Sequence, residues 1–209
     1  MTKARESLER LVEGNRRFAQ DLPSKSALDS SARRSELLGG QQPSAIILGC
    51  SDSRVPAEIV FDQGLGDLFV IRVAGNIVAP SQVGSVEFAA EQIGVQLVVV
   101  MGHSSCGAIE ATVDQLERPG AERSPNLSSI VERIRPTVET LMESGLVNDR
   151  QALIRAAVRA NVRTSVDHLC HGSAIIERLV ANDELLVVGA EYSLETGYVD
   201  FFDRMPGSD

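Results

Sequence analysis

Short apolar runs alternate along this chain with longer segments in which apolar and polar residues mix. The runs span four to six residues, a length typical of buried strands rather than of amphipathic helices. We predict strands at residues 45–48, 68–73, 97–101, 185–190 and 198–202. Because helical segments separate the first four strands, we expect right-handed crossovers and a mainly parallel α/β sheet. The last strand is predicted to pair as an antiparallel edge.

Apolar residues recur at helical spacing in the segments between these strands. Residues 3–20 form an amphipathic pattern with little core ahead of it, so we expect an N-terminal helix that packs on a second subunit or folds back over the domain. We expect one domain over residues 1–209, with a helical arm at 1–40 and an α/β core at 44–202. Ser81 is predicted to cap the helix at 85–93. Other helices are predicted at 32–38, 56–61, 105–116, 127–142, 149–169 and 174–180.

Composition restricts the class of protein further. The 209 residues are 43% hydrophobic and 23% charged, which suits one globular domain with its own core. The net charge of -9 argues against surfaces that bind nucleic acid or an anionic membrane. No apolar run is long enough to cross a membrane, and the first residues lack a signal core. Three cysteines, an odd number, suit a reducing compartment, so we expect a cytoplasmic protein.

Two short stretches carry the candidate chemistry. Cys50, Asp52 and Arg54 follow the first predicted strand, and His103 and Cys106 follow the third. Neighbouring parallel strands end at the same edge of a sheet, which would bring these side chains within reach of one metal ion. Thiolate and imidazole are ligands that suit tetrahedral zinc. Two Cys, one His and a water make a catalytic site, whereas Asp52 in the fourth position would close it.

Simpler interpretations exist for each residue alone. A Cys at a strand end is often a small core residue, and Asp52 beside Arg54 is often an ordinary ion pair. The coincidence of both stretches favours the metal site. By contrast, we interpret His168 and the adjacent Cys170 and His171 as structural, because neighbouring residues of a helix point in different directions.

The motifs Cys-x-Asp-x-Arg at residues 50–54 and His-x-x-Cys at 103–106 resemble those of the β-class carbonic anhydrases. The flanking residues 50–58, 66–72 and 102–108 agree, and the likeness runs from about Leu11 to Phe202. The resemblance implies zinc held by Cys50, His103 and Cys106. It also implies an Asp52–Arg54 dyad beside the fourth zinc position.

The family resemblance implies an activity and an assembly as well. Members hydrate carbon dioxide reversibly to bicarbonate and a proton by means of a zinc-bound hydroxide. They form homodimers with clefts at the subunit interface, often paired into homotetramers, and the N-terminal helices embrace the partner. By position, Gln41, Phe69, Phe88 and Gly107 resemble substrate-binding residues, Gln41 reaching across the interface and the two Phe forming an apolar wall.

Some members carry a second bicarbonate site made by a Trp, an Arg and a Tyr. Arg72 and Tyr192 stand at two of those positions, but Ile47 stands at the Trp position and the chain contains no Trp. The sequence therefore does not support bicarbonate inhibition through this site.

Asp52 is interpreted as a conditional fourth ligand. We expect Arg54 to hold it away from zinc in an open, active form, and expect a closed form, with pH as a candidate trigger, in which Asp52 excludes water. Two alternatives remain open at the level of sequence. One is a zinc-stabilised scaffold in which Asp52 closes the site permanently, and the other is hydrolysis of a related heterocumulene such as CS2.

Overall fold

A five-stranded sheet forms the centre of the molecule. The computed structural model describes residues 2–22, 24, 31–118, 124–143 and 148–205. The strands lie in the order β2-β1-β3-β4-β5, the first four parallel and β5 antiparallel to β4, as predicted. Their bounds are β1 (Ala45–Gly49), β2 (Leu68–Arg72), β3 (Leu97–His103), β4 (Leu186–Tyr192) and β5 (Val199–Asp203).

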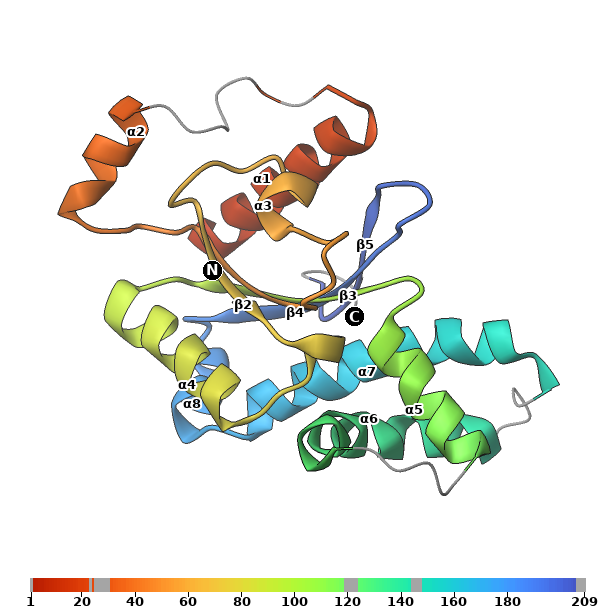
Figure 1. Ribbon diagram of the computed structural model, residues 1–209. Coiled ribbons are helices and arrows are strands. Elements are labelled where there is room, and N and C mark those ends of the chain that lie inside the picture. Colours follow the sequence, from red (N-terminus) through yellow and green to blue (C-terminus); the bar gives the residue numbers. More distant parts are fainter. Residues whose placement is uncertain (1, 23, 25–30, 119–123, 144–147, 206–209) are drawn as a thin grey trace.

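Helices cover both faces of the sheet (Figure 1). On one face lie α1 (Thr2–Ala19) and α3 (Ala57–Val60). The other face carries α4 (Pro80–Phe88), α7 (Arg150–His171) and α8 (Ala174–Ala181), and α5 (Gly107–Glu117) and α6 (Pro125–Glu143) pack together beside α7. Alternate residues of β1 and β3 face two separate core clusters. Burial on both faces explains why these strands are continuous apolar runs in the sequence.

The helix α7 packs closely on the sheet at Gly102, where β3 has no side chain. A Cβ atom on Gly102 would lie 2.7 Å from Cγ2 of Val162, closer than carbon atoms approach without displacement. Gly102 immediately precedes His103 at the end of β3. This close approach brings polar side chains of α7 to the edge where the parallel strands end.

The helix α2 (Ser31–Glu36) lies away from the body of the molecule (Figure 1). It is followed by the 3-10 turn η1 (Leu37–Gly39). No residue of α2 is buried, and Leu38 is 88% exposed. Within the predicted arm, α2 therefore contributes little to the core, whereas α1 buries Ala4, Leu8 and Leu11.

The predicted start of α4 is wrong. The helix begins at Pro80 with Ala79 as its N-cap residue, so Ser81 lies in the first turn and its hydroxyl bonds to Gln82 instead of capping the backbone. Proline fixes the backbone angle of a first helical turn and has no N–H to satisfy there. The α-helix ends at Phe88 and continues as the π-turn η3 (Ala89–Ile93). Within the described residues, no helix combines the length and apolar character needed to cross a membrane.

Candidate metal centre

The candidate site lies where the chain changes direction across the sheet. β1 connects to β2 on one side, whereas β3 lies on the other side of β1, with Gly49 beside Met101. Cys50 follows β1, His103 ends β3, and Cys106 is the N-cap residue of α5. Such switch points leave a crevice at the carboxyl ends of parallel strands. The fold therefore brings together residues more than 50 positions apart in the sequence.

The three predicted ligands form one cluster. The ligand atoms of Cys50, His103 and Cys106 all lie within 4.8 Å of one another, and all three residues are buried. The Nδ1 atom of His103 lies 2.9 Å from the carbonyl oxygen of Ser104, which fixes a tautomer with the proton on Nδ1. Nε2 is then a buried acceptor without a hydrogen-bond partner in the described structure. An unpaired imidazole nitrogen facing two thiols is the arrangement a metal ligand needs.

The two thiols influence each other's ionisation. A hydrogen bond from Cys106, together with His103 and the Gly75 amide, lowers the pKa of Cys50 despite its burial. The hydrogen bond to Cys50, burial and the charge at Cys50 in turn raise the pKa of the Cys106 thiol. Repulsion between the two sulfur atoms therefore opposes ionisation of both. A cation between the sulfur atoms would remove this repulsion, and tetrahedral zinc accepts such a donor set. The residues present therefore fit a zinc ion.

Arg54 holds Asp52 at the rim of the cluster. Its Nε and Nη2 atoms donate to Oδ1 and Oδ2 of Asp52 at 2.9 and 2.7 Å, and its backbone N–H donates to Oδ1 at 3.0 Å. These bonds keep the pKa of the Asp52 carboxyl well below its usual range. Oδ2 of Asp52 also lies 3.8 Å from Nε2 of His103. An ionised carboxylate is thus held beside the three ligand atoms.

Arg72 makes contacts at this site that the sequence did not predict. Its Nε donates to the carbonyl oxygen of Cys50 at 2.9 Å and its Nη2 to that of Asp52 at 2.5 Å. The guanidinium therefore clamps the backbone that carries both side chains. One signal was present in the sequence, because Arg72 is a charged residue at the end of an otherwise apolar strand.

The remaining substrate-binding predictions lie apart from the cluster or at its margin. Gln41 lies in the arm, where it borders a groove with residues of α2. Phe69 and Phe88 pack on each other with ring centroids 6.3 Å apart, and Phe88 is 51% exposed. Gly107 begins α5 beside Cys106, and the position that a Cβ atom would take on it has no other heavy atom within 4 Å. Their roles in substrate binding stay predictions.

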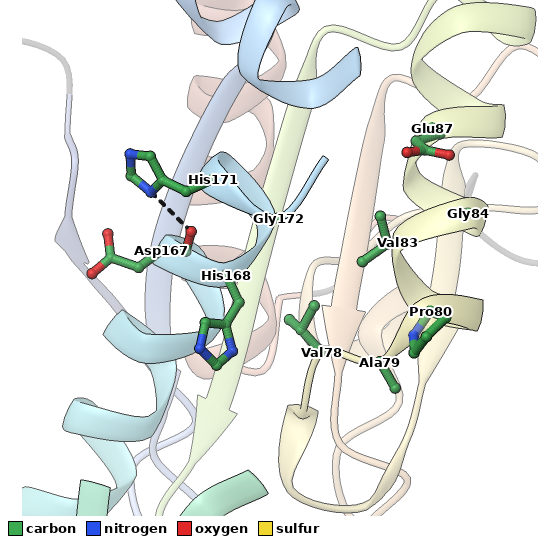
Figure 2. A pocket seen from close by; sticks show the side chains of 10 residues that line it. All are labelled: Val78, Ala79, Pro80, Val83, Gly84, Glu87, Asp167, His168, His171 and Gly172. Atoms are coloured by element: carbon green, nitrogen blue, oxygen red, sulfur yellow. Dashed lines mark hydrogen bonds between the residues drawn. The ribbon is translucent and has the colours of Figure 1, made fainter. Parts of the chain in front are cut away.

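His168 and His171 lie at a different place. They border a pocket of about 820 Å³ between the end of α7 and the start of α4. In Figure 2 the rings of His168 and His171 point away from each other, and Nδ1 of His171 bonds back to the Asp167 carbonyl oxygen at 3.0 Å. The residues that line this pocket include none of the three candidate ligands. A structural interpretation of both histidines is therefore retained.

Comparisons with known proteins agree on one family. The family model for carbonic anhydrase matches residues 45–199. Carbonic anhydrase 2 of Mycobacterium tuberculosis is 39% identical over 189 residues, which cover 90% of this chain and 87% of that protein.

Solved structures agree as well. The β-carbonic anhydrase CcaA superimposes with a TM-score of 0.75 at 26% identity, covering 96% of this chain and 93% of that one. A tetrameric β-carbonic anhydrase of the filamentous ascomycete Sordaria macrospora superimposes with a TM-score of 0.71 at 26% identity, covering 81% of this chain and 85% of that one.

Proposed function

Because this chain belongs to the β-class carbonic anhydrase family, we propose that Cys50, His103 and Cys106 hold the zinc ion at which it hydrates carbon dioxide to bicarbonate and a proton. The observation that carries this assignment is the buried cluster of three ligand atoms beside an ionised carboxylate. When bound, zinc acts as a Lewis acid that lowers the pKa of a water molecule from about 15.7 to about 7.

Asp52 orients the reacting water in this proposal. As an ionised carboxylate it can only accept hydrogen bonds, so it fixes one O–H bond of a water molecule and turns a lone pair toward the carbon atom of the substrate. Support comes from its 3.8 Å separation from Nε2 of His103. Arg54 keeps the carboxylate ionised and directs it, as a bidentate partner.

The same geometry supports a gate, in which Asp52 either leaves the fourth metal position open or occupies it. Asp52 lies close enough to the ligand atoms that rotation of its side chain away from Arg54 would place a carboxylate oxygen at the fourth metal position. Water would then be excluded and the site inactive. The ion pair with Arg54 corresponds to the open arrangement. We assign Arg54 the task of holding that arrangement.

A groove of about 890 Å³ borders this region, and Arg54, Ser104 and Ser105 lie along it. Nη2 of Arg54 also reaches the carbonyl oxygen of Ser105 at 3.3 Å. Arg54 therefore links the carboxylate to the loop between His103 and Cys106. We propose this groove as the route by which carbon dioxide reaches the site.

We propose a homodimer or a dimer of dimers as the working assembly. Support comes from the arm, whose helix α2 buries no residue of its own, and from the tetrameric β-carbonic anhydrase of Sordaria macrospora. Gln41 would then reach the site of the partner. The three buried free cysteines suit a reducing compartment, so the cytoplasm is the proposed location.

Stopped-flow measurement of carbon dioxide hydration on zinc-loaded protein tests the activity. We expect rapid hydration by the wild type, together with one zinc ion per chain by mass spectrometry. Cys106→Ser should lose both zinc and activity while circular dichroism shows the fold retained. A zinc-replete wild type without hydration activity would overturn the proposal.

A further inference from the structure

A short turn lies directly behind the candidate metal centre. The 3-10 segment η2 (Ala74–Asn76) follows β2, and both Gly75 and Asn76 have left-handed backbone angles, with φ of 69° and 43°. The N–H group of Gly75 donates to Sγ of Cys50 at 3.3 Å. The turn therefore gives one candidate ligand a hydrogen bond that the sequence motifs do not reveal.

Two buried side chains of α7 reach this turn from the opposite side. Nδ2 of Asn161 donates to the carbonyl oxygen of Gly75 at 2.8 Å, and Oγ of Ser165 donates to that of Asn76 at 3.0 Å. Asn161 is 2% exposed and Ser165 3% exposed. Burying polar groups is unfavourable unless they are hydrogen-bonded, so these two contacts fix the position of the turn.

Gly75 is also enclosed by the elements that surround the cluster. A Cβ atom on it would lie 2.8 Å from Cδ1 of Ile134 on α6 and 3.0 Å from Cβ of Ala108, two residues after Cys106. With its carbonyl held by Asn161, Gly75 has little freedom to rotate. Its N–H group is consequently directed at the sulfur atom of Cys50.

We propose that Asn161 is a positioning residue of the metal centre, which acts by holding Gly75 so that its N–H group donates to Cys50. An N–H···S bond withdraws electron density from a thiolate and fixes the direction of its lone pairs. A metal bound there would receive less charge from Cys50 and would be held more firmly in place. This inference rests on the metal site of the proposed function, but it concerns metal binding and not the hydration step.

Asn161 and Ser165 bond to the carbonyl groups of successive residues of the turn. Asn161 bonds to the carbonyl group of Gly75, the residue whose N–H group donates to the sulfur, whereas Ser165 bonds to the carbonyl group of Asn76, one residue further along. The two α7 residues thus offer a matched pair, similarly buried and attached to the same turn, of which one holds the residue that contacts the ligand.

Asn161→Leu and Ser165→Ala test the proposal in the full-length protein loaded with cobalt(II) or zinc. Asn161→Leu keeps the branched skeleton of the side chain and removes the donor, and Ser165→Ala removes the neighbouring bond. The first readout is the sulfur-to-cobalt charge-transfer band in the near-ultraviolet spectrum. The second is the rate at which zinc passes to a competing chelator, and thermal unfolding of both variants provides the reference for stability.

For Asn161→Leu we expect a charge-transfer band at longer wavelength than in the wild type and zinc transfer about tenfold faster. Ser165→Ala should lower the melting temperature and leave the band in place. An unshifted band in Asn161→Leu, or equal shifts in both variants, would overturn the proposal. If Asn161→Leu does not fold, Asn161→Ser is measured in its place under the same criteria. The outcome is separable from the proposed function, because a protein without hydration activity would still give these spectra.

Discussion

At the scale of single residues, the candidate site depends on how neighbouring side chains hold Asp52. Arg54 makes three hydrogen bonds to its carboxylate, and Arg72 binds the backbone on which it stands. Arg54 therefore holds the carboxylate and Arg72 holds the backbone beneath it, although Arg54 itself is largely exposed. The proposed role of Asp52 therefore depends on the direction in which its carboxylate is held, and less on how deeply the side chain is buried.

Arg54→Gln should separate activity from stability. The variant loses the bidentate bond, so Asp52 is free to turn toward the metal, and kcat/KM for carbon dioxide hydration should fall about 10- to 100-fold. The melting temperature should barely change, because exposed ion pairs contribute little to stability. Arg178→Gln is the control and should keep full activity, because it breaks only an ion pair between Arg178 on α8 and Glu91 on η3, away from the site. Undiminished hydration by Arg54→Gln would exclude the gate.

Gly75→Ala should destabilise the protein by about 1–3 kcal/mol, since the new methyl group meets Ile134 and Ala108 at a left-handed backbone position. Chemical denaturation of the metal-free protein measures this cost independently of metal binding. Gly84→Ala is the matched control. It lies in α4 with open space around it and should gain about 0.4–1 kcal/mol. Equal stability of the two variants would show that the turn tolerates a side chain.

At the scale of elements, α1 packs on the core through Ala4, Leu8 and Leu11, and one buried amide adds hydrogen bonds to two other elements. Nδ2 of Asn15 donates to the carbonyl oxygens of Val60 at 3.1 Å and Gly197 at 2.9 Å, and its Oδ1 accepts from the N–H group of Val199 at 2.8 Å. These bonds join α1 to α3 and to the start of β5. Asn15 therefore helps to fix where the N-terminal helix lies on the sheet.

Asn15→Ala should lower the free energy of unfolding by about 2–4 kcal/mol, because it leaves two buried carbonyl groups and one N–H group without partners. Urea denaturation measures the loss, and amide exchange should rise first in β5. Glu13→Ala on the same helix removes only an exposed pair with Arg16 and should leave the unfolding midpoint nearly unchanged. A midpoint for Asn15→Ala equal to that of Glu13→Ala would contradict this account of the helix.

At the scale of the whole molecule, α2 and the η1 turn after it are little buried by the rest of the described chain. The helix α2 has no buried residue, and Leu38 exposes most of its side chain to solvent. Arg33 attaches this segment to the body by bonds to Leu65 and Asp67. In the proposed dimer, a second subunit would bury Leu38.

Leu38→Asp should therefore shift the protein toward monomers, because a charged side chain would have to be desolvated in the interface. Multi-angle light scattering after gel filtration measures the molar mass. Leu127→Asp, at another exposed leucine on α6, is the matched control and should keep the mass of the wild type. A Leu38→Asp variant with unchanged mass at dilute concentration would place the subunit contact elsewhere.

Much of the fold was predictable from local patterns. Apolar runs predicted all five strands. The segments between them predicted the helices, and most helix ends lie within a few residues of the predicted positions. The start of α4 was wrong because Pro80 and Ser81 both offer a start signal and the proline determines the first turn. At the site, Arg72 and Asn161 were missed because their partners are backbone carbonyls distant in sequence, which side-chain motifs do not record.

The sequence by itself determined which residues end the strands and what chemistry they offer, because strand and helix periodicity and ligand type are local properties. Only the tertiary structure decided that β1 lies beside β3, since strand order depends on long-range pairing and β2 intervenes along the chain. That pairing brings Cys50, His103 and Cys106 within 4.8 Å of one another. It also places α7 behind Gly75, where contact between distant elements directs a backbone N–H group at a ligand sulfur.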